Sequence, residues 1–336
     1  MSQNTDSPSV QPVTGDGASP RVLAVVLLLA VVIALLMWQL KRQQPTLTLH
    51  DPTLAPTPPA EILYRELPAL KTGFAVSRGL ALDQAGGLYL VGDQSVAYVD
   101  QHGRRSLLAQ LPAPPRCLVP AGDGGFFVGL VDHVEQFDRR GVRLASWPLL
   151  GSRACLTSLA LGKDGVLWVA DAGNREVLGY ARGGVLQYRL GRQDAARHIP
   201  GLVVPSAHLD VLVAADGTLL VTNPGLRQVE YYRPTGDLLR SWGDSSNADG
   251  GFAGCCNPTN IALLPDGRVV TSEKSIPRVK LYSATGRYLG MVAPPQDFRA
   301  TAAGLALAVA TDGRILVLDP TMNTVRTFVP KTGEQK

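Results

Sequence analysis

The residues of this chain with the clearest potential for reactivity are two adjacent cysteines, Cys255 and Cys256. The chain has two further cysteines, Cys117 and Cys155. If the protein is exported, Cys117 could pair with Cys155 and Cys255 with Cys256 as disulfides. A disulfide between neighbouring cysteines is strained and easily reduced, which suits a redox element. The thiols could instead hold a metal or an iron–sulfur cluster, although no Cys-x-x-Cys spacing supports this. They could also stay unpaired as small apolar side chains. All four are therefore redox candidates, with the unpaired state favoured.

A second group of candidates consists of polar side chains that follow apolar runs in a series of similar loops. Asp and Asn in such loops often bond their own backbone, so turn formation and capping are the competing interpretation. Together these side chains would form a mixed-charge rim suited to a peptide or a polar protein partner. The binding-face candidates are Asp171, Asn174, Arg175, Asn223, Arg227, Glu273, Lys274, Arg278, Asp319 and Asn323.

Metal or cofactor chemistry has weaker support in the sequence. His133, His198 and His208 could reach the same rim, and three converging histidines would suggest zinc or copper. However, they occupy unrelated loop positions. The sequence contains no Ser-His-Asp pattern, no phosphate-binding loop and no paired carboxylates at a recognisable spacing. We therefore predict no cofactor, and a binding protein rather than an enzyme.

The elements that must position these residues come from a repeat. A glycine turn precedes a β-rich run six times, at intervals of roughly 40 to 50 residues, a period typical of propeller blades. Glycine is needed there because a tight hairpin turn requires a positive φ. The six turn glycines are Gly86, Gly124, Gly165, Gly217, Gly267 and Gly313.

Each repeat contains four predicted strands. In the fourth repeat they cover residues 210–214, 218–222, 228–233 and 238–242. The last repeat has only three strands before Pro330, and Ile62 to Leu67 has the pattern of the missing fourth. An N-terminal strand that completes the last blade would close the ring and remove an exposed edge. We therefore predict an all-β, six-bladed β-propeller over residues 61–330.

The longest connections between repeats indicate which face carries the function. They are Gly191 to Ala207 and Gly243 to Thr259. In a four-stranded blade these connections share a face with the loops between the second and third strands. The charged loops and the cysteines should therefore converge around the mouth of the central channel, where elaborated loops on a rigid scaffold usually carry function.

The run Leu167 to Tyr180 closely resembles the repeat unit of NHL-repeat β-propellers. The motif Cys255-Cys256-Asn257-Pro258, followed by residues 264–267 and 271–280, is also similar to a group of membrane-anchored bacterial NHL proteins. The resemblance implies a six-bladed propeller that serves as a sensing platform, as in the NHL domains of receptor kinases. It is weak at Asp132-His133, which replaces the usual loop, so no role is carried over there.

The N-terminal residues predict a membrane tether. Residues 1–20 form a polar, disordered tail, and residues 21–40 form a transmembrane anchor around the apolar run Val22 to Trp38. Residues 41–60 read as a Pro-rich linker and residues 331–336 as a short C-terminal tail. Basic residues flank the anchor on both sides, so charge does not decide its orientation. We expect a single-pass protein of the bacterial inner (cytoplasmic) membrane, with the propeller on the extracytoplasmic side.

Three hypotheses of function follow. The net charge of +4 is small for 336 residues and no basic cluster is present, which argues against a nucleic-acid partner. The leading hypothesis is a non-enzymatic platform that binds a protein or peptide on its loop-rich face. The alternative is a redox or metal-dependent accessory or enzyme that uses the Cys255-Cys256 loop and the channel face. The third hypothesis is a purely structural role for the propeller. It predicts that Arg175→Ala and Lys274→Ala leave the capture of a partner unchanged.

Overall fold

The computed structural model describes residues 24, 29, 31–33 and 61–331. The chain divides into two compact units, Met1–Ala55 and Pro56–Lys336. In the first unit the described residues are exposed and helical. The predicted tail, most of the predicted anchor, the predicted linker and residues 332–336 lie outside the described residues. Among the residues that are described, no helix has the length and apolar character needed to cross a membrane.

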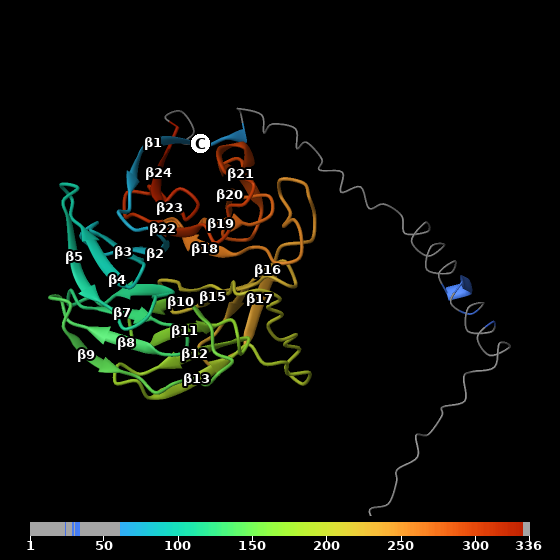
Figure 1. The fold of residues 1–336 in the computed structure, drawn as a ribbon, viewed down its shortest axis with the longest axis horizontal. Coiled ribbons are helices and arrows are strands. Elements are labelled where there is room, and N and C mark those ends of the chain that lie inside the picture. The colour runs from blue at the N-terminus through green and yellow to red at the C-terminus, as the bar shows by residue number, and fades with distance from the viewer. Residues whose placement is uncertain (1–23, 25–28, 30, 34–60, 332–336) are drawn as a thin grey trace, which may run out of the picture. The chain divides into compact units, whose positions relative to one another are not determined.

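The second unit contains six four-stranded sheets arranged in a ring (Figure 1). Blade one consists of β2 (Ser77–Leu82), β3 (Leu88–Gly92), β4 (Ser95–Val99) and β5 (Arg105–Gln110). Blade two consists of β6 (Cys117–Pro120), β7 (Phe126–Gly129), β8 (Val134–Phe137) and β9 (Arg143–Ser146). Blade three consists of β10 (Leu156–Leu161), β11 (Leu167–Asp171), β12 (Glu176–Tyr180) and β13 (Leu186–Leu190).

Blade four consists of β14 (Val211–Val213), β15 (Leu219–Asn223), β16 (Gln228–Tyr232) and β17 (Leu238–Trp242). Blade five consists of β18 (Asn260–Leu263), β19 (Val269–Glu273), β20 (Arg278–Tyr282) and β21 (Tyr288–Ala293), followed by a short 3₁₀ turn at Pro295–Asp297. Blade six consists of β22 (Ala306–Val309), β23 (Ile315–Asp319), β24 (Thr324–Pro330) and the N-terminal β1 (Tyr64–Lys71). The six predicted repeats are thus confirmed as blades, and the strands predicted in blade four are correct to within one residue at each end.

The middle strands of each blade are buried on both faces because neighbouring blades pack against them. Every residue of β11 and β12 is buried, whereas most of β13, at the outer edge, is at least partly exposed. Between blades three and four, Trp168 and Leu190 pack with Val211 and Tyr232 in one apolar cluster. Such clusters lie between the sheets and cover both faces of each middle strand. The sequences of these strands are therefore near-continuous runs of apolar residues.

The Asp-Gly turns connect the first and second strands of the blades. At Gly165 the backbone φ is +80°, a conformation that glycine adopts without a steric penalty. The Asp164 carboxylate accepts the Val166 N–H at 3.1 Å, which satisfies a donor that the turn leaves free. We call the side of these turns the lower face and the opposite side, with the loops between second and third strands, the upper face.

The ring closes through a strand from the N-terminal part of the chain, as predicted. β1 pairs antiparallel with β24, with Tyr64 opposite Pro330 and Lys71 opposite Thr324. Tyr64 is 3% exposed, and the Arg326 Nε donates to Glu66 Oε1 at 2.8 Å across the two strands. The strand begins two residues later and runs further than the predicted Ile62 to Leu67. Because β24 runs from the upper to the lower face, the chain enters β1 at the lower face.

Candidate functional site

Several of the polar residues predicted on the upper face connect neighbouring loops through hydrogen bonds, and we call such a connection a tie. Asp171, at the end of β11, accepts the N–H of Cys155 through Oδ1 at 2.9 Å and also those of Gly173 and Asn174. Its Oδ2 accepts the Asn174 side-chain amide at 2.7 Å. One buried carboxylate thus closes its own loop and holds the connection that enters the blade, as expected for a capping aspartate.

The same kind of tie recurs in other blades. Asn223 accepts the Val203 N–H at 2.9 Å and donates to Glu230 at 2.8 Å. Asn323 accepts the Ser77 N–H at 2.9 Å and so joins blade six to blade one, while Asp319 accepts the Thr321 N–H within its own loop. A binding role for these candidates stays a prediction.

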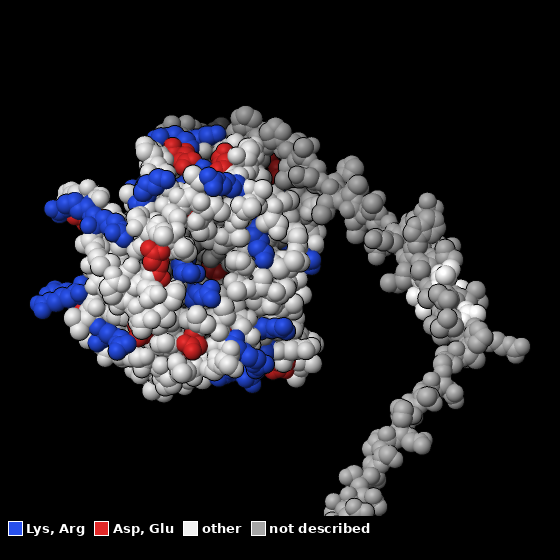
Figure 2. Space-filling view, in the orientation of Figure 1, with Lys and Arg blue, Asp and Glu red and all other residues white. Residues whose placement is uncertain are grey.

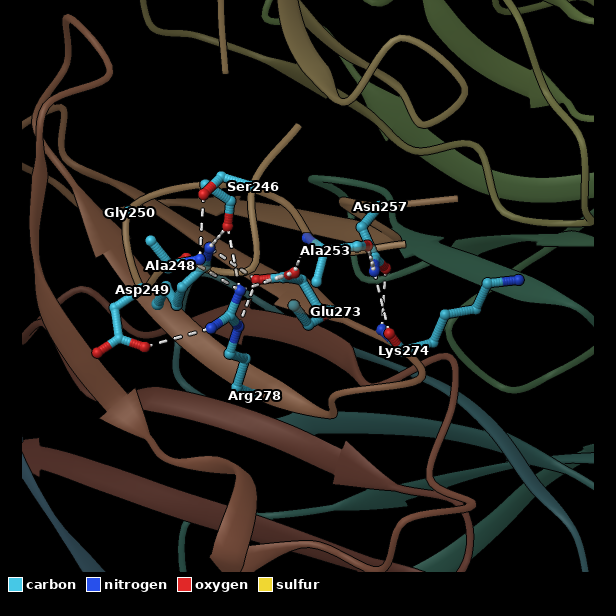
Figure 3. Close-up of polar contacts among 12 residues, drawn as sticks. Ser246, Ala248, Asp249, Gly250, Ala253, Asn257, Glu273, Lys274 and Arg278 are labelled. Carbon is cyan, nitrogen blue, oxygen red and sulfur yellow. Dashed lines mark hydrogen bonds and ion pairs between the residues drawn. The ribbon is translucent and has the colours of Figure 1, made fainter. Parts of the chain in front are cut away.

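Blade five replaces the single tie with a buried ionic cluster (Figure 3). Glu273 Oε1 lies 2.8 Å from Arg278 Nε and 2.7 Å from Lys280 Nζ, and these three side chains are between 0% and 1% exposed. Glu273 Oε2 accepts the Ala253 N–H at 2.9 Å, and Arg278 and Lys280 both donate to the Gly251 carbonyl. We call Glu273, Arg278 and Lys280 the buried triad. It holds the long connection between blades four and five against the blade.

Three of the predicted candidates keep their charged groups nearer to solvent on the upper face. Arg175 is exposed, and its side chain makes no hydrogen bond or ion pair within the described part of the chain. Arg227 donates to the Gly254 carbonyl at 3.0 Å. Lys274 extends away from the buried triad (Figure 3), and its Nζ donates to Ser206 Oγ at 2.9 Å.

The central channel contains a cavity of about 440 Å³. The first strands of the blades line it, and Figure 2 shows a hollow near the centre of the ring with basic and acidic atoms beside it. At its upper end stand the cationic side chains Arg78 and Arg116, with His208 and Asp210 from the connection that enters blade four and Asn260 from blade five. No carboxylate of the described residues forms an ion pair with either arginine.

Two polar atoms of this lining are buried without a hydrogen-bond partner among the residues that the structure describes. They are Arg78 Nε, which is a donor, and Asn260 Oδ1, which is an acceptor. Buried polar groups in folded proteins are almost always paired, so an unpaired donor and an unpaired acceptor in one cavity favour a ligand-binding role for it.

Asp210 and His208, both in the channel lining, have displaced pKa values. Burial raises the pKa of Asp210 to about 6, although its carboxylate accepts the Val211 and Ile261 N–H groups at 2.9 and 2.8 Å. Burial lowers the pKa of His208 to about 4, and the positive charge of Lys274 lowers it further. At neutral pH His208 is therefore uncharged and Asp210 is largely ionised, so Arg78 and Arg116 together leave a net positive charge at the channel mouth.

The raised pKa of Asp210 predicts a pH dependence of stability. The folded state holds this proton up to about pH 6, whereas the unfolded chain releases it near the ordinary value of 3.8. The group's contribution to the free energy of unfolding therefore falls as pH rises between these values, by about 3 kcal/mol in total. We expect this decrease in the free energy of unfolding to be absent from the Asp210→Asn variant when the variant and the unmodified protein are unfolded with urea from pH 4 to pH 7. An identical pH profile in the variant would contradict the assignment.

The structure places the four cysteines toward the upper face as free thiols. Cys117 is buried at the start of β6, and Cys155 is partly buried just before β10. Cys255 is exposed and Cys256 is buried, and their Sγ atoms lie 3.0 Å apart.

The predicted histidines do not form a common site. His133 Nδ1 lies 2.7 Å from Asp132 Oδ1, His198 is exposed in the connection between blades three and four, and His208 lines the channel. Within the described residues, no three or more His, Cys, Asp or Glu side chains lie together as a possible metal site. A metal-dependent alternative therefore stays a prediction.

The sequence interpretation missed Arg78, Arg116, Asp210 and Asn260. A usable signal was present, because Arg78 and Arg116 each stand eight residues before the turn glycine of their blade. Asp210 and Asn260 each stand seven residues before theirs. Equivalent positions on the inner strands of a propeller meet around the channel, so comparing the repeats position by position would have found them.

Six four-stranded blades around a channel, closed by an N-terminal strand, define this chain as a six-bladed β-propeller. Similar solved structures include the gluconolactonase of Xanthomonas campestris, at 16% identity and a TM-score of 0.59 over 81% of this chain and 92% of that one. Virginiamycin B lyase from Staphylococcus aureus has 12% identity and a TM-score of 0.56, covering 80% and 99%. Regucalcin from Agrobacterium tumefaciens has 12% identity and a TM-score of 0.58, covering 78% and 94%.

At these identities the likeness shows the fold alone. No protein-family model and no curated protein matches the chain. The NHL resemblance, with the membrane anchoring implied by the Cys-Cys-Asn-Pro motif, therefore stays a prediction.

Proposed function

We propose that this chain is a non-enzymatic binding platform that takes a carboxylate of a peptide or protein partner into the upper mouth of its channel. One observation carries the proposal. The guanidinium of Arg78 lines a cavity of about 440 Å³ with its Nε buried and unpaired. A guanidinium presents a planar set of donors that matches a carboxylate with two parallel hydrogen bonds.

The rest of the lining suits the end of a peptide chain. Asn260 offers a buried acceptor, Oδ1, which needs an N–H donor. A C-terminal carboxylate and the amide N–H beside it supply both an acceptor for Arg78 and a donor for Asn260. Arg116 adds a second positive charge at the mouth, while His208 is neutral at physiological pH. The balance of charge therefore favours an anionic ligand.

The path of the chain supports a tethered platform. The chain enters β1 at the lower face, which is the side of the propeller opposite the channel mouth proposed to bind the partner. In this proposal residues 21–40 anchor the protein in a bacterial cytoplasmic membrane. The propeller then presents the channel mouth to partners on the extracytoplasmic side.

A peptide array tests the proposal directly. Each sequence is displayed twice, once with a free C-terminal carboxylate and once with an amide, and is probed with the full-length protein. We expect binding to the free acids to exceed binding to their amides by roughly 10- to 100-fold, because a hydrogen bond to a charged group contributes about 1.5–3 kcal/mol. Arg78→Met should abolish this preference.

Arg153→Met is the matched control, because Arg153 is exposed at the upper face and is not part of the channel lining. This variant should bind as the unmodified protein does. Equal binding to acids and amides, or an unchanged preference in Arg78→Met, would contradict the proposal.

A further inference from the structure

The loop that carries Cys255 and Cys256 is held firmly at both ends. On one side, the Ala253 N–H donates to Glu273 of the buried triad at 2.9 Å. On the other, Asn257 donates to the carbonyls of Ala253 and Lys274 at 2.6 and 3.0 Å and accepts the Lys274 N–H at 2.9 Å (Figure 3). The two thiols therefore stand on a rigid segment, which fixes their positions relative to each other.

The two thiols differ in access and in surroundings. Cys255 is exposed, whereas Cys256 is 4% exposed and its Sγ lies 3.0 Å from that of Cys255. Beside Cys256 stand the Lys274 ammonium and the Ser206 hydroxyl, which are themselves joined by a hydrogen bond of 2.9 Å. A cation and a hydroxyl next to a buried sulfur are the surroundings that stabilise a thiolate.

The two pKa values move in opposite directions. Burial raises the pKa of the Cys256 thiol, but hydrogen bonds from Cys255, Ser206 and Lys274, with the charge of Lys274, outweigh burial and leave it below its ordinary value. The hydrogen bond to Cys256 and the charge of that sulfur raise the pKa of Cys255. The first proton lost by the pair therefore leaves a thiolate on Cys256 that accepts a hydrogen bond from the Cys255 thiol.

We propose that Cys255 and Cys256 form a dithiol–disulfide exchange centre, with Cys255 as the sulfur that meets the partner and Cys256 as the resolving sulfur. Its substrates are accessible disulfides and, in the reverse direction, thiols. This activity goes beyond the binding of carboxylates in the channel and does not depend on it.

The exchange balances in two steps. The Cys255 proton passes to the Cys256 thiolate, and the Cys255 thiolate attacks one sulfur of the substrate disulfide. A mixed disulfide forms at Cys255, and the first substrate thiolate leaves and takes the proton from Cys256. The Cys256 thiolate then attacks Cys255 Sγ, which forms the Cys255–Cys256 disulfide and releases the second substrate thiolate. Two electrons pass from the protein to the substrate, which leaves as one thiol and one thiolate, and the thiolate takes a proton from water.

In the reverse direction Lys274 acts as a positioning residue. An external thiolate attacks the exposed Cys255 sulfur and expels Cys256 as a thiolate beside the Lys274 ammonium. A leaving thiol of lower pKa leaves faster, so Lys274 should accelerate reduction. A disulfide between adjacent cysteines is also strained, which makes it an oxidising and readily reduced one.

The test uses the full-length protein with Cys117→Ala and Cys155→Ala, so that only the pair can react. The protein is equilibrated with mixtures of reduced and oxidised glutathione, and the thiols are trapped by alkylation for intact-mass and peptide analysis. We expect reversible loss of two hydrogens from the peptide that contains Cys255 and Cys256. Irreversible oxidation, disulfide-linked dimers, or two free thiols in excess oxidised glutathione would each overturn the proposal.

Single replacements distinguish the two sulfurs. In Cys256→Ser, the mixed disulfide with glutathione should accumulate at Cys255 because no resolving thiol remains. In Cys255→Ser, the buried Cys256 should react slowly. The opposite pattern would overturn the assigned roles.

Lys274→Met tests the positioning residue, with Lys163→Met as the control because Lys163 is exposed in a lower-face turn. We expect the rate at which dithiothreitol reduces the pair to fall roughly 3- to 10-fold in Lys274→Met, since reduction rates depend on the pKa of the leaving thiol. The rate in Lys163→Met should be unchanged. Equal rates in the two variants would remove Lys274 from the mechanism.

Discussion

Glu273→Gln is expected to destabilise the protein by about 3–5 kcal/mol, which is the typical loss when one partner of a buried ion pair is removed. Glu273 is the carboxylate that contacts both Arg278 and Lys280 at 2.8 Å or less, and all three side chains are almost fully buried. The substitution keeps the volume but leaves two buried cations. Within the described part of the chain, only Arg278 of these two reaches another carboxylate, that of the partly exposed Asp249, at 3.3 Å. The measurement is the free energy of unfolding in urea.

This loss should depend on pH through Lys280. Burial lowers the pKa of Lys280 to about 8. The charge of Arg278 lowers this pKa as well, whereas the carboxylates of Glu273 and Asp249 raise it. Without Glu273 this pKa falls further, so at pH 9 Lys280 is neutral. The one buried cation left in the triad is then Arg278, which keeps its contact with Asp249. The destabilisation should therefore be smaller at pH 9 than at pH 6.

Asp266→Asn is the matched control, because the Asp266–Arg268 pair at 2.7 Å is partly exposed on the surface. Exposed pairs contribute about 0–1 kcal/mol, so this variant should stay close to the unmodified protein. Equal losses in Glu273→Gln and Asp266→Asn would show that the buried triad has no special structural role.

Removing residues 1–71 is expected to cost at least as much stability as breaking the buried triad. It deletes β1, exposes the edge of β24, and removes the packing of Tyr64. Burial of a tyrosine covers about 150–250 Å², which is worth on the order of 4 kcal/mol at about 25 cal/mol per Å². An exposed strand edge also pairs readily with other chains. We therefore expect a lower unfolding midpoint and soluble oligomers in size-exclusion chromatography.

The control is the chain that lacks residues 1–60, which keeps β1. It should remain as stable as the full-length protein and show the same oligomeric state. If the two truncated chains unfolded at the same urea concentration, closure by β1 would not stabilise the ring.

The blades could be predicted because each depends on local signals. Gly165, with its positive φ, and the apolar runs beside it lie within one repeat and need no distant partner. The closure strand was predicted less accurately. Proline usually ends a strand, yet β1 continues beyond Pro68 through an irregular register between Leu67 and Leu70 to Lys71. Ile62, the first predicted residue, instead bridges to Met291 of β21.

The site was harder to predict because burial there is a tertiary property. Glu273 and Arg278 have the sequence pattern of exposed loop residues, and it is residues 244–253, folded over them, that make them a buried triad. Arg78 and Asn260 belong to blades one and five, and they line one cavity only once the ring has closed. By contrast, the placement of the Cys255-Cys256 loop in the connection between blades four and five followed from the repeat pattern alone.

The route by which the chain enters the ring also determines how the domain responds to force. A load that pulls residue 61 away from the lower face, while a partner holds the upper face, acts along β1 and β24 rather than across them. The backbone hydrogen bonds between the two strands, from Tyr64 opposite Pro330 to Lys71 opposite Thr324, then share that load in shear. A load between residue 61 and the C-terminal end of β24 would instead separate the same bonds one at a time. The strand that completes the ring is thus also a mechanical clamp, strong in one pulling direction and weak in the other.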